Sequence, residues 1–199
     1  MADTKISALN ALTGANVDPA ADLLAIVDTG GSETKKILVN QLSSALITLT
    51  ADQATTSGTA FDFTGIPAGV KRITMIFAEV GLDGADHLLV QLGDAGGPET
   101  GSYVSTSGAM ADAGASVVVN STSGFIVACG GGVVSGSIVI NLVDSASFHW
   151  VASHSGKIST VAAICGGGDK SLSAELTQIR LTRSGTNSFD AGAVTIQYE

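Results

Sequence analysis

Histidine is the residue of this sequence best suited to metal binding and to acid–base chemistry, and the chain has three, His87, His149 and His154. His149 and His154 are an odd number of positions apart, so on one strand their side chains would point to opposite faces. A metal site would need one of them on a loop, with Asp83 or Asp86 beside His87, and no ligand spacing encodes that arrangement. We therefore expect surface histidines and no metal ion.

No serine or lysine stands in a recognisable catalytic setting. The serine-rich chain has no G-x-S-x-G elbow. The stretch CGGGDKS (165–171) is similar to a phosphate-binding loop, but Asp169 takes the place of the glycine that should precede Lys170, and no long helix follows. A glycoside hydrolase would need two carboxylates facing each other in a cleft, a pair that a sequence cannot show. We expect no enzyme and no cofactor.

Two further groups of residues could bind ligands. The glycine-rich acidic segments LDGADH (82–87) and LGDAGGPETG (92–101) offer oxygen ligands for calcium, but they lack the EF-hand spacing, and solvated turns explain them better. Trp150 and His149, in the stretch SFHWVAS (147–153), could form a stacking platform for a carbohydrate, whereas a single tryptophan on a strand is more often part of the core.

The charge balance excludes several partners. The 199-residue chain has 18 acidic and 9 basic residues, a net charge of −9, and its basic residues form no cluster beyond two adjacent pairs. Nucleic acids and anionic lipids are bound by clustered Lys and Arg, so we expect neither as a partner. Two cysteines, Cys129 and Cys165, are too few for a disulfide framework, and we expect both to be reduced and buried.

An uncharged stretch over 113–143 raises the alternative of a membrane span. Its most apolar part, 125–143, is interrupted by glycines and serines, and no basic residue flanks it. Two strands around a glycine turn are therefore the better interpretation, and we expect no membrane span. ACGGG (128–132) is echoed by ICGGG (164–168), which we interpret as two strand ends that need the backbone freedom of glycine. The N-terminus shows no secretory signal pattern.

Residues 1–46 form a small N-terminal module by pattern. A strand is expected over 23–28, a glycine turn over 29–33, and a second strand over 34–39. Asn40 can then cap a short helix that ends at Leu46. This hairpin and helix are too small to bury much apolar surface, so they should pack on a partner or on copies of themselves.

After a linker over 47–60, residues 61–199 alternate between apolar and polar side chains in short runs separated by glycine-rich turns. This pattern predicts an all-β domain, an antiparallel jelly-roll-like β-sandwich of about nine or ten strands. The expected strands are KRITMIFAEV, DHLLVQLG, ASVVVN, GFIVAC, GSIVINLV, SFHWVAS, ISTVAAIC, AELTQIRLT and AVTIQY, with Ile73, Met75, Phe77, Leu88, Val90 and Leu92 facing the core.

Two segments carry a resemblance to known proteins. KISALNALTGANVDPAADLLAIVDTGGSETKKILVNQL (5–42) resembles the N-terminal module of many bacteriophage virion proteins, especially tail-fibre and related surface proteins. The second begins TSGTAFDFTGIPAGVKRITMIF (56–77), continues through LLVQLGDAGGPETGSY (88–103), and closes with LTQIRLTRSGTNSFDAGAVTIQYE (176–199). It is similar to a domain that recurs in phage structural proteins.

The resemblance implies a virion structural protein, a homotrimer, made in the host cytoplasm and carried on the surface of the particle. Its N-terminal module would dock on the major capsid protein or on a tail or adaptor protein. The residues expected to make this contact are Leu23, Ile26, Val27, Lys35, Lys36, Ile37 and Leu42.

The chain has no shaft, since heptads, collagen-like repeats and β-helix periods are all absent. A receptor-binding fibre needs reach, whereas a capsid decoration or cement protein needs only to cover or bridge shell subunits. We therefore expect a decoration protein. The alternative is a short tail fibre or tailspike-like adhesin that recognises a host-surface glycan.

Overall fold

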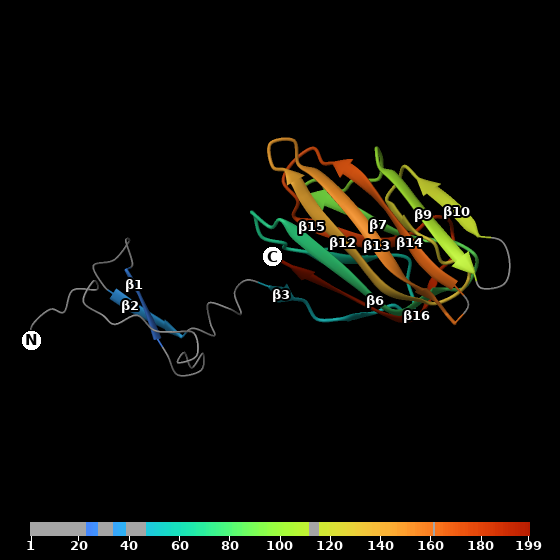
Figure 1. Cartoon of the computed structure of the whole chain (residues 1–199), viewed down its shortest axis with the longest axis horizontal. Coiled ribbons are helices and arrows are strands. Elements are labelled where there is room, and N and C mark those ends of the chain that lie inside the picture. Colours follow the sequence, from blue (N-terminus) through green and yellow to red (C-terminus); the bar gives the residue numbers. More distant parts are fainter. Residues whose placement is uncertain (1–22, 28–33, 39–46, 112–115, 161) are drawn as a thin grey trace, which may run out of the picture. The chain divides into compact units, whose positions relative to one another are not determined.

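The computed structural model describes residues 23–27, 34–38, 47–111, 116–160 and 162–199 of the chain, and every regular element in them is a β-strand. The chain divides into two compact units, Met1–Thr48 and Leu49–Glu199. Figure 1 labels the strands of both units.

The first unit contains an antiparallel hairpin. Its strands β1 (Leu23–Val27) and β2 (Thr34–Leu38) pair so that Leu23 lies opposite Leu38 and Val27 lies opposite Thr34. Both strands predicted for this module are thereby confirmed. The turn expected over 29–33 and the helix expected after Asn40 lie outside the described residues.

The second unit is a sandwich of two antiparallel sheets, as predicted; a jelly-roll connectivity stays a prediction. The nine-stranded sheet has the order β10-β9-β14-β13-β12-β6-β16-β3, with β4 also paired to β16, and the five-stranded sheet has the order β11-β7-β15-β5, with β8 on β7. The strands of the larger sheet are β3 (Thr48–Leu49), β4 (Gln53–Ala54), β6 (Arg72–Leu82), β9 (Val104–Ala111), β10 (Val117–Ser121), β12 (Val134–Asp144), β13 (His149–Ile158), β14 (Ala162–Ser171) and β16 (Phe189–Tyr198). Those of the smaller sheet are β5 (Phe61–Thr64), β7 (Leu88–Asp94), β8 (Gly97–Pro98), β11 (Phe125–Val127) and β15 (Gln178–Arg183).

The segment 47–60, expected to be a linker, contributes to the sandwich for most of its length. Thr50 donates its backbone N–H to the carbonyl of Ile196 at 3.0 Å, and Thr55 donates to Gly192 at 2.8 Å. The side chain of Thr55 is fully buried. Residues from Leu49 onward therefore belong to the second unit.

The most apolar part of the uncharged stretch, 125–143, contains two strands around a glycine turn, as expected. Gly130 and Gly131 adopt φ angles of 61° and 87°, which glycine tolerates without strain. The two strands, β11 and β12, do not form a hairpin, because they belong to different sheets. No helix in the described part of the chain is long and apolar enough to cross a membrane.

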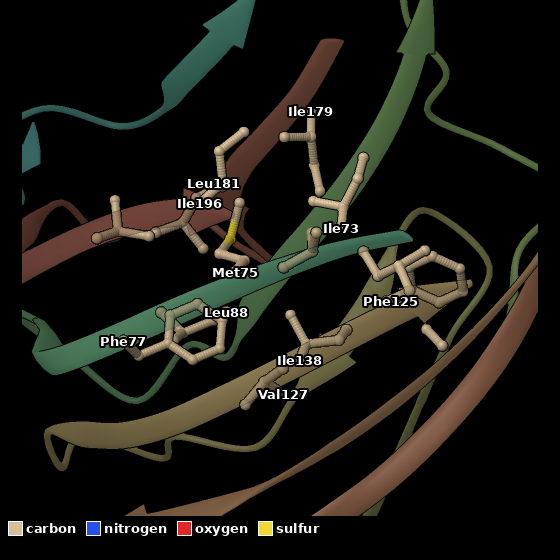
Figure 2. Close-up of a cluster of buried hydrophobic side chains, with 14 of the residues drawn as sticks. Ile73, Met75, Phe77, Leu88, Phe125, Val127, Ile138, Ile179, Leu181 and Ile196 are labelled. Atoms are coloured by element: carbon tan, nitrogen blue, oxygen red, sulfur yellow. The ribbon is translucent and has the colours of Figure 1, made fainter. Parts of the chain in front are cut away.

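The core lies between the two sheets and follows the predicted alternation. Ile73, Met75 and Phe77 of β6 are at most 3% exposed, as expected for every second residue of a half-buried strand. Figure 2 shows side chains from both sheets in this layer, among them Phe77, Leu88 and Ile138. Burying one such side chain contributes about 1.5–3 kcal/mol to stability.

Serine hydroxyls join the two sheets along one border. Ser105 and Ser107 lie on the inner side of β9, and their Oγ atoms accept the backbone N–H groups of Ile126 and Ala128 at 2.9 and 3.0 Å. Strand β11 pairs with a neighbouring strand only on its β7 side, so these hydroxyls satisfy donors that would otherwise be unpaired.

Candidate interaction surface

Six of the seven residues predicted to dock on a partner lie on the two strands of the hairpin. Leu23, Ile26 and Val27 lie on β1, and Lys35, Lys36 and Ile37 lie on β2. In the hairpin register Ile26 is opposite Lys35. Leu42 lies outside the described residues.

A second surface, which the sequence analysis did not identify, is the outward side of the nine-stranded sheet. The strand registers align its side chains in two adjacent rows, and none of these residues is buried or charged. Five strand spacings of roughly 4.8 Å make each row about 24 Å long. We call this surface the outer face; its rows are Thr74, Val139, Ser153, Gly167, Thr106 and Asn120, and Ile76, Ser137, Ser155, Cys165, Gly108 and Val118.

Charged residues border the outer face. Asp169, which follows Gly167 on the same side of β14, lies 3.6 Å from His149 Nε2, and two other border residues form ion pairs. Lys157 Nζ lies 2.6 Å from Glu79 Oε1, and Arg72 Nη1 lies 3.2 Å from Glu199 Oε1. The hydrogen bond from Lys157, together with one from a serine, lowers the pKa of Glu79 and keeps the carboxylate ionised. Exposed apolar side chains also border the rows; they are Val104, Met110 and Val151.

The outward side of the five-stranded sheet differs in character. Arg180 and Asp62 form a two-pronged ion pair across it, with Nε–Oδ1 and Nη2–Oδ2 distances of 2.6 and 2.8 Å. The hydrogen bond from Arg180 lowers the pKa of Asp62 against the effect of burial. The absence of charge is therefore particular to the outer face, and it is not general to the sandwich.

His154 is buried, so the expectation of three surface histidines is wrong for it. Its Nε2 lies 2.9 Å from Ser107 Oγ, and only 6% of the residue is exposed. Burial lowers the pKa of His154 to about 4. Gly166 on the neighbouring strand makes room for the imidazole, because a Cβ at that position would lie 2.5 Å from His154 Cε1. His149 is on the opposite face of β13, as the odd spacing predicted.

Lys170 is also buried, although it belongs to the segment that is similar to a phosphate-binding loop. That segment is the regular strand β14, and it forms no loop. Lys170 Nζ lies 2.5 Å from Glu99 Oε2 and 5.3 Å from the centre of the Tyr103 ring. Burial raises the pKa of Glu99, but hydrogen bonds from Lys170 and Ser173 outweigh it and leave the pKa below its usual value.

The two acidic segments use their carboxylates to hold backbone amides. Asp86 Oδ2 accepts the N–H of Asn187 at 2.8 Å, and Asp83 Oδ1 accepts the N–H of Ser188 at 2.9 Å. Asp94 Oδ1 likewise accepts the N–H of Gly96 at 2.7 Å. Among the described residues no group of three or more His, Cys, Asp or Glu side chains is placed to hold a metal ion.

The remaining candidate residues, a tryptophan and two cysteines, differ in whether they are buried or exposed. Trp150 is 2% exposed and belongs to the core, so it forms no exposed stacking platform with His149. Both cysteines are free thiols; Cys129 is buried as predicted. Cys165 is exposed, contrary to expectation, because it points away from the core on β14.

The chain matches no family model, no curated protein and no solved structure. The resemblance to phage virion proteins therefore stays a prediction. What the structure defines is an all-β protein with an N-terminal hairpin unit and an antiparallel sandwich unit.

Proposed function

We propose that this chain is a non-enzymatic structural protein of a bacteriophage particle, of the capsid decoration or cement type. The hairpin unit docks on the major capsid protein, or on a tail or adaptor protein, through the docking residues on β1 and β2. The sandwich unit is displayed outward on the surface of the particle. The protein is synthesised in the host cytoplasm and incorporated as a homotrimer.

The outer face is the observation that carries this proposal. Copies of a chain with a net charge of −9 repel one another, and the repulsion is weakest where their contact contains no charge. The outer face offers twelve uncharged residues, and Lys157 and Arg72 at its border are paired within the chain. It therefore supports an association between copies, as expected for a decoration protein that covers or bridges shell subunits.

Removal of residues 1–46 tests the docking role. The sandwich should remain folded, because its core and sheets are formed by residues from Leu49 onward. The shortened protein should no longer join phage particles produced without the full chain, as measured by gel analysis of purified particles. The full chain, supplied in the same way, is the control. Incorporation of the shortened chain at the level of the full chain would contradict docking through the hairpin unit.

The location of the protein distinguishes decoration from the adhesin alternative. Mild chaotropic treatment should release a decoration protein and leave weakened heads, whereas a fibre should be found on purified tails. An adhesin should bind host cells through residues 47–199 alone, which keep all the strands of the sandwich. The burial of Trp150 removes the exposed platform that favoured this alternative.

A further inference from the structure

Strand β10 forms one edge of the nine-stranded sheet and, within the described part of the chain, pairs only with β9. The pairing runs without a bulge from Val117, opposite Ala109, to Ser121, opposite Ser105. Figure 1 shows β10 at the border of this sheet. An edge strand presents a row of unpaired N–H and C=O groups on its free side, so β10 has the backbone groups to accept a further strand.

The other strands at the borders of the two sheets are protected against such pairing. Strands β3, β4 and β8 have only two residues each, and serines of β9 occupy amides of β11. Strand β5 carries the charged Asp62, whose backbone carbonyl accepts the Gln53 side chain at 3.2 Å. Short length, charge and coverage are the usual means of protecting an edge. Strand β10 has none of them, because it is five residues long and the segment 116–124 contains no charged residue and no proline.

The side chains of β10 also favour an added strand. Val117 and Val118 are 49% and 66% exposed, and Val119 packs against the border of the core. Three consecutive β-branched residues favour the extended backbone that a further strand would pair with. A strand added here would cover exposed apolar surface and would satisfy free backbone groups in one step.

We propose that β10 pairs antiparallel with β10 of a second copy of this chain, around a two-fold axis at Val119. In this register Val119 lies opposite its own counterpart, Val118 lies opposite Asn120, and Val117 lies opposite Ser121, so all five residues are paired. Two identical antiparallel strands are self-complementary, so one surface serves both partners. Copies with a net charge of −9 repel one another least where the contact contains no charge, and β10 meets that condition.

The pairing joins two nine-stranded sheets into one and leaves the outer faces of both copies uncovered on the same side. Because Val118 and Asn120 belong to the two rows of the outer face, each row continues into a row of the second copy. Five residues a side bury far less than the roughly 1,000 Å² of a stable interface, so we expect a dissociation constant on the order of 1 mM. Dilute protein therefore stays unpaired at this edge, and copies held close together pair. The inference goes beyond the proposed function and requires neither the virion nor the hairpin unit.

Disulfide trapping tests this contact in the full chain carrying Cys165→Ser, Ser153→Glu and Ser155→Glu. These changes remove the exposed thiol and place charge on the outer face, so that neither contributes to the result. Val119→Cys adds a thiol at the two-fold axis, about 5 Å from its counterpart between Cβ atoms. Oxidised glutathione, added at a protein concentration near the expected dissociation constant, should link the copies into dimers on a non-reducing gel.

Val118→Cys in the same chain is the matched control. Position 118 is more exposed than position 119, but it lies opposite Asn120, so its own counterpart is a diagonal neighbour about 7–8 Å away. A disulfide does not span that distance without backbone movement. Val119→Cys should therefore link at least about tenfold faster than Val118→Cys. Linking of Val118→Cys at the same rate or faster would indicate random collision and would overturn the proposal.

A mixture of Val117→Cys chains with Ser121→Cys chains tests the same register without altering Val119. The two chains should link to each other at least about tenfold more often than each links to its own kind, as measured by the mass of the dimers. An even mixture of the three possible dimers would contradict the register. Linking that appears only after removal of residues 1–46 would show that the hairpin unit occupies this edge in the full chain, and would also overturn the proposal.

Discussion

His154 is the side chain on which moderate acid should act first. Ser107 Oγ accepts the N–H of Ala128 and forms a second hydrogen bond with His154 Nε2, in which either atom can be the donor. His154 Nδ1 has no hydrogen-bond partner among the described residues. Adding a second proton would place a charge in the core, and burial accordingly lowers the pKa of His154 to about 4.

The stability of the sandwich should therefore fall as the pH falls from about 6.5 to about 4. In that window the unfolded chain binds a proton on His154 and the folded chain does not, which lowers the free energy of unfolding by up to about 3 kcal/mol. Urea unfolding at several pH values should show a smaller dependence for His154→Gln than for the natural chain.

His87→Gln is the control for this prediction, because burial also lowers the pKa of His87 while a nearby aspartate partly offsets it. The effect of His87→Gln on the pH dependence should be the smaller of the two. Equal pH dependence in the natural chain and in His154→Gln would show that the imidazole is not the group that titrates.

Lys170 should contribute more to stability than any exposed lysine. Lys170→Met keeps the apolar stem but removes the ionic partner of Glu99, which is 22% exposed. Loss of a partner from a fully buried pair costs about 3–5 kcal/mol, and partial exposure of Glu99 reduces the expected loss to about 2 kcal/mol. Lys157→Met, at the exposed pair with Glu79, should change the urea midpoint far less. Equal shifts of the two midpoints would contradict a structural role for the buried pair.

At these positions the sequence predicts which face of a strand a side chain lies on better than it predicts whether the side chain is buried. Strand alternation places His149 and His154 on opposite faces, and it correctly suggests a core position for Trp150. The burial of His154 and Lys170 could not be predicted, because their partners Ser107 and Glu99 are distant in the sequence. Contacts between side chains that are distant in the sequence depend on the topology of the sheets, and the spacing of residues within one segment does not encode that topology.

At the scale of elements, the glycines at 166–168 are explained by how closely strand β14 approaches its neighbours. The sequence analysis placed a strand end at these residues, and this is wrong, because they lie inside β14. A Cβ on Gly166 would collide with the backbone oxygen of Thr106 and with the ring of His154. The glycines are therefore needed for close approach between strands.

Gly166→Ala should destabilise the sandwich by roughly 1–3 kcal/mol, because the added methyl group overpacks a closed space. Gly101→Ala is the matched control, since a Cβ on Gly101 would meet no atom within 4 Å. Thermal unfolding followed by circular dichroism would measure both. A Gly166→Ala protein as stable as Gly101→Ala would show that β14 can shift to accommodate the methyl group.

Strands with a run of apolar or alternating residues were mostly predictable, although the short strand β5, with the sequence FDFT, was missed. Eight of the nine strands expected after residue 70 correspond to strands of the sandwich, whereas the expected strand ISTVAAIC (158–165) spans the last residue of β13, a turn at 159–160 and the start of β14. Strand β9, with the sequence VSTSGAMA, was missed because its inward positions include the serines that bind β11. The strands within 47–60 were missed because two-residue strands are too short to show a period.

For the whole molecule, the outer face should decide whether copies associate. Ser153→Glu with Ser155→Glu places two carboxylates in the middle of its rows and should shift the proposed trimer to monomer in light scattering. Thr56→Glu with Ser57→Glu adds the same charge at exposed positions outside the face and should leave the mass unchanged. A trimer that survives the first pair of substitutions would place the contact between copies elsewhere.

The outer face could not be predicted from the sequence, because its residues come from six strands and each strand contributes only two of them. Single serines, threonines and glycines on a strand are unremarkable. Their uniform lack of charge becomes visible only when the register aligns them across the sheet.

The serine hydroxyls that cover β11 also bear on how the protein behaves when many copies are crowded together. An uncovered border strand can recruit a strand from a neighbouring molecule and seed a growing fibril. Ser105 and Ser107 occupy the amides of Ile126 and Ala128, so this border offers fewer donors to an incoming chain. Dense arrays of the sandwich are thereby protected at this border against amyloid-like polymerisation, without the charged gatekeeper residues that commonly serve this purpose.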